Sequence, residues 1–126
     1  MKHVKLGLSL LAALLAIGLL LAGCLSGLRT QLCGTLDTAA SQALAGDWAA
    51  ANHAANTGRQ LWEEHHKFVA AVVDHELLEE ADTLFAQLEV YRTLKLTAEY
   101  AAVCKCLVRQ MEAIGESQSL RWWHFL

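Results

Sequence analysis

A chain of 126 residues has room for one N-terminal hydrophobic segment and one domain of roughly 100 residues. It contains no proline, the strongest helix breaker, so a sequence rich in Ala and Leu favours helices throughout. The net charge is −3, but Lys2 and Lys5 precede the hydrophobic segment, and 8 basic and 13 acidic residues follow it. This acidic remainder argues against nucleic acid and anionic headgroups as partners.

The N-terminal segment has the composition of a membrane anchor. Residues 6–25 contain no charged side chain, and as a helix these 20 residues span about 30 Å, the thickness of a hydrocarbon core. Lys2 and Lys5 favour a cytoplasmic N-terminus. We therefore expect residues 1–24 to be an N-terminal membrane anchor or lipoprotein signal peptide, and residues 25–126 to form an extracytoplasmic helical domain.

The form of the anchor has two interpretations. Residues 21–24, Leu-Ala-Gly-Cys, match the lipobox of bacterial lipoprotein signal peptides, in which Cys24 is lipidated and becomes the new N-terminus. The other interpretation is an uncleaved transmembrane helix, because apolar residues continue at helical spacing with no flexible tether after Cys24. Either form places the protein at the cell membrane, as a single-pass or lipid-anchored protein.

Beyond the anchor, apolar residues recur at three- and four-residue steps in four stretches. The residues expected to face inward are Leu25, Leu28, Leu32, Leu36, Ala39 or Ala40 and Ala43; Trp48, Ala51, Ala55, Gly58, Trp62, His65, Val69 and Val72; Leu77, Leu78, Ala81, Leu84, Phe85, Leu88 and Tyr91; and Tyr100 or Ala101, Cys104, Leu107 or Val108, Met111 and Ile114. Short connections predict antiparallel neighbours. The expected fold is all-α: an N-terminal transmembrane helix followed by an antiparallel four-helix bundle or two stacked helical hairpins.

Local signals predict where these helices begin and end. Gly46 suits a helix end, and Asp47 can cap the next helix. Asp74 is expected to cap the third helix, Thr97 to begin the fourth, and Gly115 to end it.

Trp48, Trp62 and His65 are expected to have structural roles. The two tryptophans lie fourteen residues apart on one helical seam, so they cannot touch each other on a straight helix. A pair of rings for stacking on a ligand is one interpretation, and anchoring of the core is the favoured one. His65 is expected at the edge of that core, beside Trp62.

A weak candidate metal site consists of His75, Glu79 and Asp82. Imidazole and carboxylate ligands suit zinc and other divalent ions, and these three residues share one face of the third predicted helix. That face is opposite the apolar one, so the simpler interpretation is a solvated acidic surface. No confident metal site and no cofactor are expected, and no catalytic motif is recognised, so we do not expect an enzyme.

The cysteines do not form a zinc pattern. Cys104 and Cys106 point to nearly opposite sides of a helix. A disulfide is chemically allowed outside the cytoplasm, and Cys33 would approach the fourth helix if the two helices are neighbours. Free, buried cysteines that pack as small hydrophobic residues are the favoured interpretation.

Four short motifs carry a resemblance to a known family. They are residues 46–48 (Gly-Asp-Trp), 62–65 (Trp-Glu-Glu-His), 74–76 (Asp-His-Glu) and 115–120 (Gly-Glu-Ser-Gln-Ser-Leu). In this order and spacing the chain resembles DUF4363, a family of small, single-anchor bacterial envelope proteins of unknown function, common in anaerobic Gram-positive bacteria. The C-terminal Trp-His-Phe-Leu departs from the family's usual ending. The resemblance implies an architecture and no activity.

The expected function is therefore a protein-interaction or structural module that binds another envelope protein or itself. The alternative is a small ligand- or metal-binding envelope sensor that uses the acidic His75 face. In an up-and-down arrangement residues 120–126 return towards the membrane, where the tryptophans would enter the interface or close the end of the bundle.

Overall fold

The computed structural model describes the backbone of residues 2–125 and the side chains of residues 2–115. It contains four helices, which are α1 (Lys2–Leu44), α2 (Trp48–Val72), α3 (His75–Leu94) and α4 (Thr97–Phe125). Only two or three residues separate successive helices. No strand occurs within residues 2–125, and the all-α prediction is confirmed.

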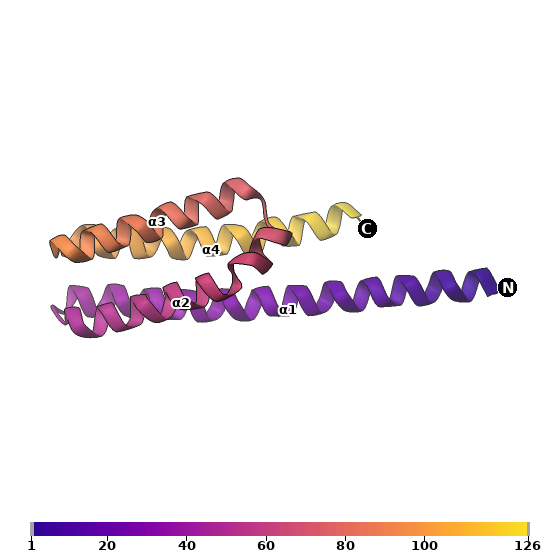
Figure 1. Ribbon diagram of the computed structural model, residues 1–126, viewed down its shortest axis with the longest axis horizontal. Coiled ribbons are helices and arrows are strands. Elements are labelled where there is room, and N and C mark those ends of the chain that lie inside the picture. Colours follow the sequence, from indigo (N-terminus) through magenta and orange to yellow (C-terminus); the bar gives the residue numbers. More distant parts are fainter. Residues whose placement is uncertain (1, 126) are drawn as a thin grey trace.

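The helices form two antiparallel hairpins that stack on each other (Figure 1). One hairpin is α1 with α2, and the other is α3 with α4. Between the hairpins, α1 packs extensively along α4, whereas α2 and α3 approach each other much less closely. The stacked-hairpin form of the prediction therefore describes the molecule better than an evenly packed bundle.

The turns between helices follow from backbone chemistry. Gly46 ends α1 with a φ of +83°, a conformation that costs glycine little. The Asp47 side chain accepts a hydrogen bond of 3.0 Å from the backbone N–H of Ala50, and so caps α2 as predicted. Asp74 occupies the N-cap position of α3 as predicted, but its side chain makes no capping hydrogen bond. Lys95 turns the chain after α3 with a φ of +53°.

The predicted end of the fourth helix at Gly115 is wrong, because α4 continues to Phe125. A glycine ends a helix where the backbone turns left-handed, and Gly115 has no positive φ. It lies against Arg29 of α1: a Cβ added there would come within 2.6 Å of Nη1, at the far end of that flexible side chain. The expectation for residues 120–126 concerns side chains outside the described residues.

The core follows the predicted stripes closely. Its most deeply buried large side chains come from three helices, and they are Leu32, Leu36, Val69, Tyr100, Cys104 and Leu107. Tyr100 lies near the start of α4, and its hydroxyl donates a 3.4 Å hydrogen bond to the carbonyl of Ala51 near the start of α2. Burial raises the pKa of Tyr100 to about 12. The Trp48 ring packs edge-on against Tyr100, with 5.2 Å between ring centroids.

The N-terminal half of α1 projects beyond the other helices (Figure 1). Its large apolar side chains are exposed, including those of Leu6, Leu10, Leu14, Ile17 and Leu20. Among the described residues, α1 alone is long and apolar enough to cross a membrane, and a signal sequence has the same features. The helix runs without a break through Cys24 and Leu25 into the core-forming half.

Candidate functional site

The boundary between α2 and α3 is bridged by side chains rather than by close backbone packing. The indole N–H of Trp62 donates a 2.7 Å hydrogen bond to Oδ1 of Asp82, and Nε2 of His66 lies 3.1 Å from Oδ2 of the same carboxylate. The Trp62 ring stacks on the Phe85 ring, with 6.0 Å between the ring centroids. Trp62 is only 2% exposed, so it packs within the core and leaves no open aromatic face for a ligand.

Because Asp82 bonds to Trp62 and His66 of α2, it is separated from His75 and Glu79, the other two residues of the candidate metal site. Asp82 turns towards α2, which the periodicity of α3 alone did not reveal. His75 and Glu79 remain together, with 2.9 Å between Nε2 and Oε1, and both are largely exposed. Within the described part of the chain, no three His, Cys, Asp or Glu side chains converge in a way that could hold a metal ion.

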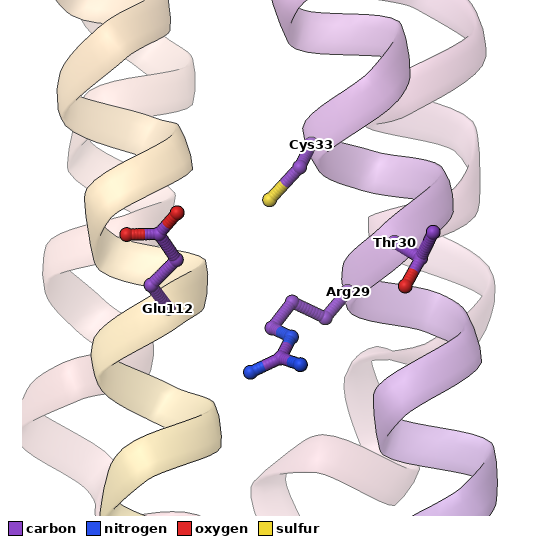
Figure 2. A pocket seen from close by; sticks show the side chains of 4 residues that line it. All are labelled: Arg29, Thr30, Cys33 and Glu112. Carbon is purple, nitrogen blue, oxygen red and sulfur yellow. The ribbon is translucent and has the colours of Figure 1, made fainter.

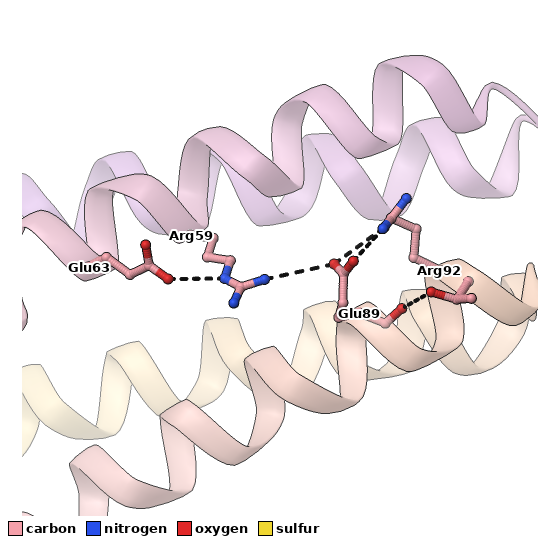
Figure 3. A network of polar contacts seen from close by, with 5 residues as sticks. Arg59, Glu63, Glu89 and Arg92 are labelled. Carbon is pink, nitrogen blue, oxygen red and sulfur yellow. Dashed lines mark hydrogen bonds and ion pairs between the residues drawn. The ribbon is translucent and has the colours of Figure 1, made fainter.

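A second polar bridge joins α2 and α3, nearer the start of α2 and the end of α3 (Figure 3). Arg59 pairs with Glu63 at 3.1 Å on its own helix and lies 3.9 Å from Glu89 on α3. Glu89 also pairs with Arg92. The hydrogen bond from Arg92 and the positive charges of Arg92 and Arg59 lower the pKa of Glu89. Exposed pairs of this kind contribute about 0.2–1 kcal/mol each. Helical spacing predicts the pairs within one helix, but not the contact between Arg59 and Glu89.

A polar cleft opens between α1 and α4 (Figure 2). Its volume is about 490 Å³, and it is lined by Arg29, Thr30 and Cys33 of α1 and by Glu112 of α4. Of the α1 residues, Arg29 and Cys33 extend towards α4 (Figure 2). Burial raises the pKa of the Cys33 thiol, and the charge of Glu112 adds to this effect. Among the side chains of residues 2–115, no ion pair joins Arg29 to Glu112. Sequence reasoning missed this cleft because its two charges lie far apart in the chain and carry no local signal.

A more apolar groove lies between α1 and α2, beside the end of the hydrophobic segment. It has a volume of about 410 Å³, and its lining includes Cys24, Gly27, Leu28, His65 and Phe68. His65 is half-buried, with Nδ1 2.9 Å from the carbonyl oxygen of Leu61. It therefore lies at the edge of the core, on the side of α2 that faces α1, whereas its neighbour His66 faces α3.

All four cysteines are free thiols in this structure. Cys104 is buried, and burial raises its pKa to about 12, as expected for a cysteine that packs as a hydrophobic residue. Cys33 does approach α4, where its Sγ lies 3.9 Å from the carbonyl oxygen of Val108. Cys24 and Cys106 are exposed, so the expectation of buried cysteines is wrong for Cys106.

Comparison with known proteins identifies a family and no activity. No curated protein and no solved structure is significantly similar to the chain. The family model described as Domain of unknown function (DUF4363) matches residues 24–123, which are most of the chain and include the second half of α1, all of α2 and α3, and nearly all of α4. The protein therefore belongs to the DUF4363 family.

Proposed function

We propose that the protein is a membrane-anchored, extracytoplasmic module without catalytic activity, which holds a partner protein or a second copy at a fixed height above the bilayer. The observation that carries this proposal is the continuity of α1. Its first half exposes apolar side chains, and its second half buries Leu28, Leu32 and Leu36 in the core. Because one helix serves both parts, no flexible linker separates the domain from the membrane.

A continuous helix sets a height. If the hydrocarbon core ends near Leu25, the 19 helical residues from there to Leu44 carry the hairpin end about 29 Å outwards. Apolar side chains are exposed at this far end. Leu44 is 63% exposed and Leu94 is 60% exposed, and they stand at the ends of different hairpins. Exposed apolar surface away from lipid favours contact with protein.

An uncleaved transmembrane helix fits this role better than a lipidated N-terminus. A helix that crosses the bilayer and enters the core constrains the domain, whereas a lipid on Cys24 would leave it free to tilt. In the full chain expressed in bacteria, Cys24→Ala should leave the apparent mass and membrane retention unchanged. Accumulation of a longer precursor together with loss of a lipid label would establish the lipoprotein form instead.

Photo-crosslinking in membranes tests the interaction role. A photoreactive residue would replace Leu44, Leu94 or, as a matched exposed control in the middle of α2, Gln60. We expect one product of defined mass from the two leucine positions and little from Gln60. A product at twice the chain mass would identify self-association. No product from the leucine positions, or equal products from all three, would contradict the proposal.

The alternative is a metal- or ligand-binding envelope sensor that uses His75. Only His75 and Glu79 are brought together on that face, so this function would need a donor from elsewhere. A rise in melting temperature when zinc is added would support it, because a ligand that binds only the folded state stabilises that state.

A further inference from the structure

The cleft between α1 and α4 lies at the level of the lipid headgroups if α1 is the membrane anchor, so this inference rests on the proposed function. Arg29 is four helical residues beyond Leu25, or about 6 Å farther out. The headgroup layer extends about 5–8 Å beyond the hydrocarbon on each side. The Arg29 side chain is therefore placed among the headgroups of the outer leaflet.

The two charges of the cleft stand at different heights. The Arg29 guanidinium lies against Gly115 of α4, where an added Cβ would meet Nη1 at 2.6 Å. Glu112 is three residues earlier in the same helix, which is about 4.5 Å along its axis. Because α4 runs towards the N-terminal end of α1 (Figure 1), the guanidinium is nearer that end and the Glu112 carboxylate is farther from it, as Figure 2 also shows. With α1 as the anchor, the N-terminal end is the membrane side.

This order of charges matches one class of headgroup. In a zwitterionic phospholipid the phosphate is attached to the glycerol, close to the hydrocarbon, and the ammonium group stands farther out on a two-carbon spacer. A guanidinium is a strong donor to phosphate oxygens, and a carboxylate accepts hydrogen bonds from a primary ammonium. The anionic headgroup of phosphatidylglycerol would satisfy Arg29 with its phosphate, but beyond the phosphate it offers Glu112 neutral hydroxyl groups in place of an ammonium.

We propose that the cleft formed by Arg29, Thr30, Cys33 and Glu112 binds the headgroup of a zwitterionic phospholipid that carries a primary ammonium, with Arg29 on the phosphate and Glu112 on the ammonium. The site is open to the surface between α1 and α4, so a lipid of the surrounding leaflet reaches it from the side. Its occupation would fix the rotation of the domain about α1 relative to the membrane plane.

Lipid retention by the full chain tests the proposal. The protein would be inserted into nanodiscs that contain equal amounts of phosphatidylethanolamine, phosphatidylcholine and phosphatidylglycerol, and the lipids that remain bound would be identified by mass spectrometry. We expect phosphatidylethanolamine to be retained about tenfold over phosphatidylcholine, because the trimethylated ammonium cannot donate hydrogen bonds to Glu112 and one charge-assisted hydrogen bond is worth about this factor.

Two variants separate the roles of the charges. Glu112→Gln should abolish the preference for phosphatidylethanolamine over phosphatidylcholine, and Arg29→Gln should lower the retention of both lipids about tenfold. Lys95→Gln and Glu99→Gln make the same charge changes at the far end of the domain, where both residues are exposed, and should change nothing. Circular dichroism of each variant verifies that it folds.

Cys33 gives a second readout at the same site. In a chain with Cys24→Ser and Cys106→Ser, alkylation of Cys33 by a neutral reagent should be slower in phosphatidylethanolamine nanodiscs than in phosphatidylcholine nanodiscs.

Equal retention of the two lipids by the wild type, or a preference for phosphatidylglycerol, would overturn the proposal and leave the anchor intact. A chain that does not insert into nanodiscs would instead overturn the proposed membrane anchoring.

Discussion

Replacing Trp62 by alanine removes the main aromatic contact between α2 and α3. The side chain is 2% exposed, stacks on Phe85 and donates to Asp82. Truncating a buried tryptophan to alanine costs about 3–5 kcal/mol, out of the roughly 5–15 kcal/mol that stabilise a small domain. Asp82 is half-exposed, so water replaces the lost donor and we add nothing for it.

The assay is thermal unfolding of the full chain in detergent micelles, followed by circular dichroism. For a domain of about 100 residues, 1 kcal/mol shifts the melting temperature by about 4–8 °C, so we expect Trp62→Ala to lower it by at least about 12 °C. Trp62→Phe keeps an aromatic ring on Phe85, and because water replaces the lost N–H donor at the half-exposed Asp82, this variant should lose much less stability than Trp62→Ala. Trp48→Ala is the matched control, because Trp48 is only half-buried and should cost less.

Two results would refute this reasoning. A Trp62→Ala chain that melts within about 2 °C of the wild type, well under the shift expected for 1 kcal/mol, would show that the ring is not part of the core. A larger loss for Trp48→Ala than for Trp62→Ala would place the main aromatic anchor at the beginning of α2 instead.

Three further predictions concern the core and the helix ends. Burial raises the pKa values of Tyr100 and Cys104, each to about 12, so their neutral forms stabilise the folded state below about pH 9–10. The free energy of unfolding should fall as the pH rises from there towards 12, by at most about 1.4 kcal/mol per pH unit for each group, and Tyr100→Phe or Cys104→Ala should flatten the fall in pH-dependent melts. Asp47→Ala should cost about 1 kcal/mol in thermal melts, because the capping bond to α2 is lost, and no change would deny the cap a role. Gly58→Ala should destabilise by about 1–3 kcal/mol, because the new Cβ would come within 2.8 Å of Oγ1 of Thr35, and adding Thr35→Ala should restore the melting temperature; a single variant as stable as the wild type would show that Thr35 moves aside freely.

The helices and their inward faces were predictable because each depends on residues close together in sequence. The leucines of α1 recur at helical spacing, and Leu28, Leu32 and Leu36 are indeed buried. The cap at Asp47 likewise depends on one turn of chain. Periodicity therefore identifies which face of a helix turns inwards, and nearby turn residues identify most of the ends.

Features that depend on a second helix were not predictable in this way. Asp82 lies on the polar side of α3 when that helix is considered alone, but α2 places an indole N–H and an imidazole beside it. Gly115 has the sequence signature of a helix end, yet in the structure it accommodates Arg29 from α1. The placement of Arg29 and Glu112 on opposite sides of one cleft likewise depends on the packing of α1 on α4, which no local pattern encodes.

Thiol labelling in intact cells most directly tests the central claim, that α1 crosses the membrane and the domain stands outside the cytoplasm. The chain would carry Cys24→Ser and Cys33→Ser, which leaves the exposed Cys106 and the buried Cys104. A maleimide that cannot cross membranes should label Cys106 in bacterial cells whose inner membrane is intact, and should label Cys104 only after denaturation. Labelling of Cys106 only after the cells are lysed would place the domain in the cytoplasm and contradict the claim.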